Sequence, residues 1–303
     1  MKSSSNPDSS PPSDLSQRFI FDDADIRGET VHLDGALQDI LAVHQYVPGV
    51  SQLIGEFLAA AVLLSTTLKF EGKLILQARS EGQIPLVMVE CSNTLQIRAI
   101  VRGAERATST RFDQLLGSGQ LAITVEPTRG NRYQSIVPLV EDSLAHSLDA
   151  YFEQSEQLAT RFWLAADQHR AGGMLLQQLP AQDEADSAQR AEQWQHVCAL
   201  AATVTEDELL ELGAGQLLHR LYHENPVRLF EPSPVAFKCS CSRERTLSAL
   251  ASIDRGEIEE ILLEQGSITM DCEFCNQQYQ FESEELTELF TTQIADTGSR
   301  ILH

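Results

Sequence analysis

Four cysteines near the C-terminus constrain the fold of this chain more than any other feature. They form two close pairs, Cys239 with Cys241 and Cys272 with Cys275, and thirty residues separate the pairs. Four thiolates are a complete tetrahedral set of ligands for zinc and leave no coordination position open for a substrate. Each pair is also short enough to close into a disulfide. The same sulfur atoms can therefore hold a metal or be oxidised, but not both at once, so the site can act as a switch.

Length, charge and termini narrow the class of protein. The chain has 303 residues, enough for more than one domain, and a formal net charge of −22, which opposes binding to nucleic acid and to a membrane surface. The longest apolar run, 53–64, contains Glu56 and is too short to span a bilayer. The N-terminal residues lack the apolar core of a signal peptide. We therefore expect a cytoplasmic protein, in which paired cysteines indicate metal binding or redox sensing before structural disulfides.

The first part of the chain has a mixed pattern of strands and helices. Residues 1–16 are rich in serine and proline and predict a disordered tail. Within the core domain expected over 17–180, the nearly all-round apolar segment 50–68 predicts a buried central helix. Alternating apolar residues predict strands at 74–78, 95–101, 121–125, 160–164 and 172–176. Helices and strands do not alternate one for one, so the fold class is α+β.

The composition changes after Pro180. Residues 181–230 include nine acidic and three basic side chains, a net charge of −6. Thr205 and Glu208 have the spacing of a capping box at the start of a short helix. Leu217, Leu218 and Leu221 form an apolar stripe on the next helix. Helices this short are unstable alone because nucleation is costly, so we interpret 181–232 as a metastable helical linker whose three leucines contact a neighbouring surface.

The last unit is predicted to span 233–296, with a tail over 297–303. Helical spacing of apolar residues follows the first cysteine pair, and alternation on both sides of the second pair predicts a hairpin with that pair at its turn. This is a small α+β domain, and bound zinc would supply much of its stability. Residues 233–303 carry five basic and thirteen acidic side chains, the reverse of what phosphate contacts require.

Three interpretations of the cysteine site compete. Most closed four-thiolate sites are structural, so the spacing alone favours static zinc in an interaction module. Two local features favour a redox switch, because the single residue between Cys239 and Cys241 requires a bend and positive neighbours favour thiolates. These neighbours are Lys238, Arg243 and Arg245. A thiol–disulfide oxidoreductase usually has its cysteines where a strand runs into a helix, whereas the residues after Cys275 predict a strand.

The remaining candidates for chemistry are weaker. We interpret Cys91 and Cys198 as buried apolar residues, and the i, i+4 pair His219 and His223 as solvated or capping side chains. The Gly172–Gly173 pair is interpreted as a requirement of the backbone and not as a phosphate cradle. The sequence contains no Ser–His–Asp, P-loop or dinucleotide fingerprint, so we do not expect an enzyme.

Several segments together resemble one known family. They are residues 237–245, the second cysteine pair with Tyr279 and Phe281, and residues 151–158, 171–176 and 220–224. These segments are similar to the 33 kDa chaperonin family of redox-regulated chaperones, and the similarity covers nearly the whole chain after the tail. Asn276 stands where glycine is frequent in the family, and both residues can take a left-handed turn.

The resemblance implies an ATP-independent holdase of the bacterial cytoplasm. In its reduced form it binds one zinc ion per chain through Cys239, Cys241, Cys272 and Cys275 and is inactive. Oxidation then forms the disulfides Cys239–Cys241 and Cys272–Cys275, zinc is lost, the linker loses structure, and unfolding client proteins are bound. The oxidised form is expected to be a homodimer. On this view, loss of zinc unfolds the C-terminal unit and withdraws the surface on which 181–230 rests.

Overall fold

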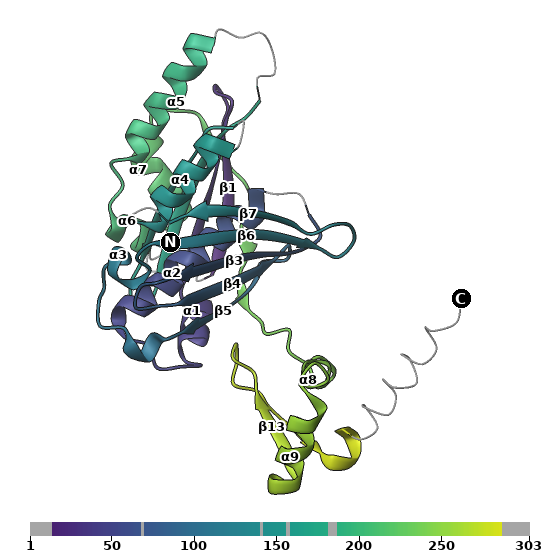
Figure 1. Cartoon of the computed structure of the whole chain (residues 1–303). Helices are drawn as coiled ribbons and strands as arrows, with labels where there is room; N and C mark the ends of the chain where they lie inside the picture. The colour runs from purple at the N-terminus through teal and green to yellow at the C-terminus, as the bar shows by residue number, and fades with distance from the viewer. Residues whose placement is uncertain (1–13, 68–69, 140–141, 156–157, 181–186, 287–303) are drawn as a thin grey trace, which may run out of the picture. The chain divides into compact units, whose positions relative to one another are not determined.

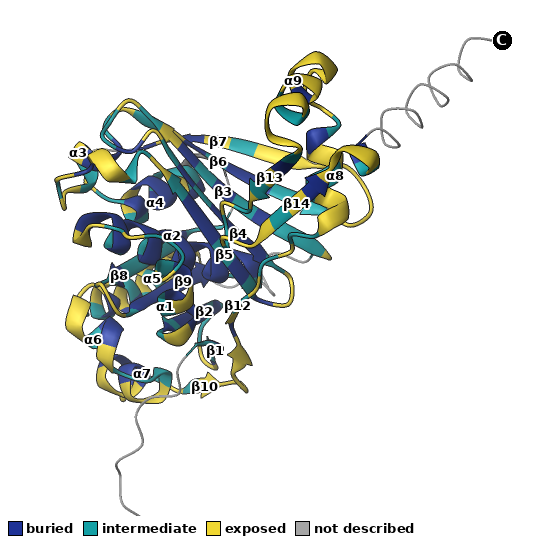
Figure 2. Ribbon diagram, turned by 90° about the horizontal axis from the view of Figure 1, so that it is seen from below, coloured by how far each residue is buried: buried dark blue, intermediate teal, exposed yellow. Residues whose placement is uncertain are grey.

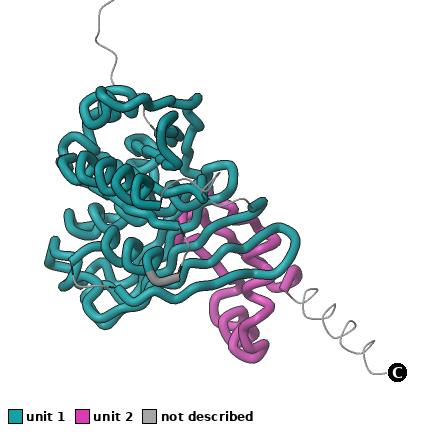
Figure 3. The backbone as a smooth tube through the Cα atoms, turned by 90° about the horizontal axis from the view of Figure 1, so that it is seen from above, with its two compact units in different colours: residues 1–238 teal, residues 239–303 magenta. Residues whose placement is uncertain are grey.

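The chain consists of two compact units, residues 1–238 and 239–303 (Figure 3). The computed structural model describes residues 14–67, 70–139, 142–155, 158–180 and 187–286. The predicted boundaries at residues 180 and 232 both lie inside the first unit. The predicted tail 297–303 lies outside the described residues. Helices and strands are mixed in both units, which confirms the α+β fold class.

The first unit contains two sheets whose strands pair almost entirely antiparallel. The first sheet has the order β10-β1-β2-β9-β8, with β11 paired to β1, and all its pairings are antiparallel. Its strands are β1 (Leu15–Phe21), β2 (Ile26–Leu33), β8 (Thr160–Ala166), β9 (Ala171–Gln178), β10 (Val227–Leu229) and β11 (Ser233–Pro234). The second sheet has the order β12-β5-β4-β3-β6-β7 and is antiparallel except where β12 joins β5. Its strands are β3 (Gly72–Ser80), β4 (Leu86–Ser92), β5 (Gln96–Arg102), β6 (Gly119–Pro127), β7 (Tyr133–Pro138) and β12 (Ala236–Phe237).

A central helix joins the two sheets into one core. Helix α2 (Pro48–Thr67) packs against apolar side chains of both sheets and is dark blue over most of its length in Figure 2, as the prediction of a buried central helix requires. By length and composition it could cross a membrane, but 83% of its apolar window is buried inside the first unit. The other helices here are α1 (Gly35–Leu41), α3 (Phe112–Leu115), α4 (Leu144–Ser155) and the 3-10 turn η1 (Ala104–Arg106).

The linker residues form three helices on the other face of the first sheet. They are α5 (Ser187–Ala201), α6 (Glu206–Glu211) and α7 (Ala214–Tyr222), which lie together in Figure 1. Strand β9 is buried on both faces, because Leu175 belongs to the α2 core while Met174 and Leu176 contact the linker helices. This explains why its sequence does not alternate between apolar and polar residues. A Cβ atom at Gly172 would lie 2.1 Å from the carbonyl oxygen of Leu209, so the glycine permits the close approach of α6.

The linker helices pack on a different surface from the one the sequence predicted. We expected 181–230 to rest on the C-terminal unit. The structure instead buries Leu217, Leu218 and Leu221 in a cluster with Phe21 and Met174 of the first sheet. An apolar stripe shows which face of a helix is buried but carries no information about its partner.

The start of the chain also differs from expectation. Leu15 and Ser16, placed in the disordered tail by composition, form the first residues of β1 and pair with β2 and β11. Just before them, Asp14 Oδ1 accepts hydrogen bonds from the backbone nitrogens of Asp34 (2.8 Å) and Ala36 (3.0 Å) and so caps α1. Long-range pairing therefore orders a segment whose composition is typical of disorder. Residues 1–13 lie outside the described part.

The second unit is small. It contains α8 (Arg243–Leu250), α9 (Arg255–Gln265) and the antiparallel hairpin of β13 (Ser267–Asp271) and β14 (Gln278–Glu282). Gly266 ends α9 in the left-handed conformation, with φ of 79°, as predicted. Residues 283–286 begin a further helix, and the rest of that predicted helix lies outside the described residues.

Candidate metal centre

Two loops of the second unit bring the four cysteines together. Cys239 and Cys241 precede α8, whose N-cap Ser242 accepts a hydrogen bond from the backbone nitrogen of Arg245. Cys272 and Cys275 occupy the turn between β13 and β14, and the backbone nitrogens of Cys275 and Asn276 donate to the carbonyl oxygen of Cys272. Asn276 has a φ of 54°, the left-handed turn expected at this position. The hairpin with the second pair at its turn is therefore confirmed.

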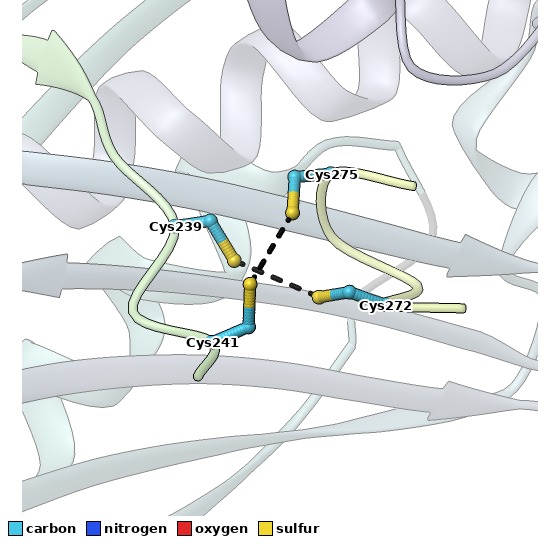
Figure 4. Close-up of side chains that lie close together, drawn as sticks. All are labelled: Cys239, Cys241, Cys272 and Cys275. Carbon is cyan, nitrogen blue, oxygen red and sulfur yellow. Dashed lines mark hydrogen bonds between the residues drawn. The ribbon is translucent and has the colours of Figure 1, made fainter. Parts of the chain in front are cut away.

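The sulfur positions fit a tetrahedral metal ion. All four Sγ atoms lie within 4.8 Å of one another, and the figure shows them converging from both loops (Figure 4). The Sγ atoms of Cys239 and Cys272 are 3.6 Å apart, and those of Cys241 and Cys275 are 3.5 Å apart. A tetrahedron with zinc–sulfur bonds of about 2.3 Å has sulfur–sulfur edges of about 3.8 Å. A disulfide bond is only about 2.05 Å long, so this arrangement is that of four reduced thiols around one point.

Arg245 holds the bend between the first two cysteines. Its Nη1 atom donates to the backbone carbonyl oxygen of Ser240 at 2.8 Å and to the hydroxyl of Ser240 at 3.0 Å. This double contact fixes the one residue that separates Cys239 from Cys241. The bend that the short spacing requires is thus stabilised by a side chain of the following helix.

Two of the basic residues near the first pair, Arg243 and Arg245, also contribute to the architecture of the site. Arg243 forms an ion pair with Glu285, with Nη2 at 2.5 Å from Oε2, and its guanidinium lies 4.5 Å from the ring centroid of Phe281. Arg243 therefore links α8 to β14 and to residue 285. Together with Arg245, it contributes to the architecture of the site through hydrogen bonds, ion pairing and stacking.

Tyr279 is the site residue that charge and spacing did not identify. Its hydroxyl donates to Cys241 Sγ at 3.2 Å. Burial opposes ionisation of Cys241, but hydrogen bonds from Tyr279 and from the neighbouring thiols outweigh it and lower the pKa of Cys241. The same contact raises the pKa of Tyr279 to about 12, because ionised tyrosine could no longer donate to the sulfur. The alternation of Tyr279 with Phe281 predicted a strand, and the position opposite Met270 turns its hydroxyl into the site.

The second pair has the opposite tendency. Burial, followed by the effects of the adjacent thiols, raises the pKa of Cys272 and of Cys275. One sulfur, Cys241, is thus favoured as a thiolate over the two in the hairpin turn. A divalent metal ion in the centre would favour the thiolate form at every ligand.

The other predicted candidates lie elsewhere. Cys91 is buried in β4, and burial raises the pKa of its thiol to about 12. Cys198 is partly buried on α5, and burial raises its pKa to about 12 as well. Both cysteines are therefore poor nucleophiles at neutral pH. The rings of His219 and His223 contact each other edge to face at 5.9 Å on α7.

The fold and the four-thiol centre together define a two-unit α+β protein with a metal or redox site, and comparisons specify the family. The family model described as "Hsp33 protein" matches residues 14–282. The 33 kDa chaperonin of Pseudomonas syringae pv. tomato is 49% identical over 296 residues, which cover 97% of this chain and 99% of that protein. The 33 kDa chaperonin of Pseudomonas paraeruginosa is 52% identical over 281 residues, which cover 92% of this chain and 95% of that protein.

A solved structure shares the fold. The crystal structure of the 33 kDa chaperonin from Thermotoga maritima superposes with a TM-score of 0.78 at 22% identity, covering 93% of this chain and 99% of that chain. The chain belongs to the Hsp33 protein family, and the resemblance stated from its sequence is confirmed. Membership of this family supports a chaperone role.

Proposed function

We propose that this protein is a redox-regulated, ATP-independent holdase of the bacterial cytoplasm. The observation that carries the proposal is the convergence of four reduced thiols in the small second unit of a chain that belongs to a chaperone family. In the reduced state, Cys239, Cys241, Cys272 and Cys275 hold one zinc ion per chain. This state is inactive.

Oxidation of the thiols changes the state of the site. Each disulfide forms in two steps. One thiolate attacks a peroxide-type or hypohalous oxidant, whose O–O or O–Cl bond breaks, and the sulfur becomes a sulfenic acid or sulfenyl chloride. The partner thiol then attacks that sulfur, water or chloride leaves, and the pair has given up two electrons to the oxidant. We propose the pairs Cys239–Cys241 and Cys272–Cys275. Oxidation of both pairs leaves no thiolate for the metal. Metal binding contributes on the order of 10 kcal/mol to the folding of such domains, so its loss unfolds the second unit.

Unfolding is transmitted to the linker along the chain. After α7, the strands β10 and β11 pair with β1, and β12 pairs with β5. Only Lys238 separates β12 from Cys239. Disorder that begins at the cysteines therefore reaches the short strands that follow the linker helices, and residues 181–232 detach from the first sheet. The apolar stripe of Leu217, Leu218 and Leu221 is then available to unfolding client proteins.

The charge of the chain suits this activity. A net charge of −22 keeps the opened protein and its bound clients soluble. Exposed apolar surface on the first sheet and on the linker also favours association of two oxidised chains, so we propose a homodimer as the active form. Nucleic acid and membranes are not expected partners, because the chain carries the same sign of charge.

One combined assay tests the function. Zinc release and suppression of aggregation of a heat-denatured client are measured on reduced and oxidised protein, with Cys198→Ala as a control that retains all four ligands. We expect oxidised protein to release zinc and suppress aggregation, and reduced protein to do neither. Equal protection by both forms would contradict the redox switch, and retention of zinc after oxidation would favour a module with static structural zinc. Multiple-turnover reduction of a disulfide substrate would identify a thiol–disulfide oxidoreductase.

The order of disulfide formation refines the proposal. A disulfide across one intervening residue closes a smaller ring than a disulfide across two, and the smaller ring is more strained. We therefore expect Cys272–Cys275 to accumulate before Cys239–Cys241 during oxidation. Mass mapping of acid-quenched samples measures the order, and early accumulation of Cys239–Cys241 would contradict it.

A further inference from the structure

The first unit contains a cavity that the chaperone cycle does not use. It has a volume of about 930 Å³ and is lined by α2, α4, β8 and the segment around α3, together with the linker helices α5 and α6. This volume lies within the range of about 300–1,000 Å³ that is typical of small-molecule sites. Aromatic and aliphatic side chains form part of the wall, among them Phe112, Phe162, Trp163 and Leu209.

Most charged groups that face the cavity are already paired. Arg111 forms an ion pair with Asp113 at 2.5 Å, and Arg161 with Asp149 at 3.2 Å. His146 Nδ1 lies 3.0 Å from Asp142 Oδ1. The Cys198 thiol, which also lines the cavity, is neutral at physiological pH because burial raises its pKa. These three pairs satisfy every basic residue of the lining.

Two carboxylates are left without a counter-charge. Glu56 is the one charged residue of α2 and Glu206 comes from the first turn of α6, and both line the cavity. In the part of the chain that the structure describes, neither carboxylate has a hydrogen bond or a salt bridge. Burial raises the pKa of Glu56 to about 7, and the like charge of Glu206 acts in the same direction. Glu56 is partly buried and Glu206 is exposed at the rim of the cavity. A carboxylate that loses water without gaining a partner is costly to ionise, and a perturbed group in a cavity is typical of a binding site.

We propose that this cavity binds a small organic cation, whose ammonium or guanidinium group pairs with Glu56 and Glu206 while its apolar stem contacts the aromatic wall. The paired acids and bases of the lining exclude an anionic ligand, because no basic side chain is left to receive one. The cation supplies the counter-charge that Glu56 and Glu206 do not have within the cavity. Because Glu56 belongs to the core and Glu206 to the linker, the bound cation also holds α6 on the first unit.

The test uses reduced, full-length protein and a defined probe. Cadaverine, a linear aliphatic diamine, is titrated by calorimetry at a pH of about 8, where Glu56 is ionised, and the diol of the same chain length serves as its neutral counterpart. We expect cadaverine to bind and the diol not to bind. Glu56→Gln, which preserves the shape of the side chain, should weaken binding at least about tenfold, and Glu206→Gln should also weaken it. Hydrogen exchange in α6 should slow on addition of cadaverine.

A charge-matched control separates a site from general attraction to an acidic protein. Asp207→Asn removes one negative charge from the same helix, at an exposed residue outside the cavity lining, and should leave binding within about twofold of the original. Lowering the pH through 7 should weaken binding, because a proton competes with the cation for Glu56. Equal affinity of Glu56→Gln and the original protein would overturn the proposal, as would equal losses in Glu56→Gln and Asp207→Asn or the absence of binding. All measurements are made on the reduced state, so their outcome is independent of the redox switch.

Discussion

The two units of the chain are stabilised in different ways. In the first unit, α2 lies among apolar side chains from both sheets, and its core includes large side chains such as Phe57 and Leu63 that are fully buried. In the described part of the second unit, the buried core consists of Leu250, Ile258, Ile268, Phe281 and Leu286. A core this small does not usually maintain a fold alone, so the zinc ion that we propose at the four cysteines would supply what hydrophobic burial does not. If the second unit depends on zinc as proposed, one event at four sulfur atoms would unfold that unit and leave the other intact.

The linker helices are intermediate between these two cases. They bury apolar side chains against the first sheet, but mainly on one face of each helix, and α6 and α7 are short. We therefore propose that the first unit has an inner core around α2 that does not depend on the metal and an outer layer, the linker helices, that detaches more easily. The following predictions test this ranking, beginning with the largest expected effect.

Removal of two metal ligands should have the largest effect. The double variant Cys239→Ser with Cys272→Ser should lose the zinc-binding free energy, on the order of 10 kcal/mol, and unfold the second unit. Hydrogen exchange should become fast over 239–286 and stay slow in β3 to β6. Metal analysis with a chromogenic chelator provides the second measurement, and Cys198→Ser should retain zinc. Stoichiometric zinc in the double variant would refute the assignment of the site.

Detachment of the linker should be the next largest effect. Leu221→Asp places a charge in the cluster beneath α7, which costs several kcal/mol, on the order of what a marginal helix contributes. We expect fast hydrogen exchange over 187–222 in reduced protein, retention of zinc, and suppression of aggregation without oxidation. Leu263→Asp is the matched control, because Leu263 is 89% exposed. If the linker of Leu221→Asp exchanged hydrogen as slowly as in the original protein, the leucine contacts would not be what holds the linker on the first sheet.

The pH dependence of the first unit should be smaller. The pKa of Glu56 is about 7 in the folded protein, above its ordinary value of 4.5. Its contribution to stability is therefore fully present below the unfolded pKa and is lost as the pH rises through 7. The free energy of unfolding should fall by up to about 3 kcal/mol across this window, at 1.36 kcal/mol per pKa unit. Urea unfolding at several pH values measures it; Glu56→Gln should remove the decline, and Asp207→Asn should retain it.

Loss of the tyrosine hydroxyl at the metal centre should have the smallest effect. Tyr279→Phe removes the hydrogen bond to Cys241 and should weaken zinc binding about tenfold, about 1.4 kcal/mol, because groups that bond to metal ligands contribute on this scale. Competition with a chelator measures the affinity. Tyr133→Phe, at a tyrosine that is 60% exposed on β7, should leave it unchanged. An unchanged affinity in Tyr279→Phe would mean that the cysteines alone determine the strength of binding.

Local patterns predicted much of the fold. The apolar run at 50–68 predicted α2, the Thr205 and Glu208 spacing predicted a capping box that the structure contains, and alternation around Cys272 and Cys275 predicted the hairpin. Each of these features depends on residues a few positions apart, whose geometry is set by the backbone of a helix, a strand or a turn. The composition of 1–16 predicted disorder, which is wrong for Leu15 and Ser16, because a strand can be ordered by partners that lie far away in the chain.

By itself, the sequence determined that four thiols are available in two pairs and that the linker has one apolar stripe, since both are properties of spacing. Only the tertiary structure decided that the stripe lies on the first sheet, that Tyr279 donates to Cys241, and that Glu56 and Glu206 face one cavity. The physical reason is that a side chain's period along its own element shows which face it occupies. Its partners depend on how elements distant in the chain pack, and that packing is decided by the apolar surface of the whole unit.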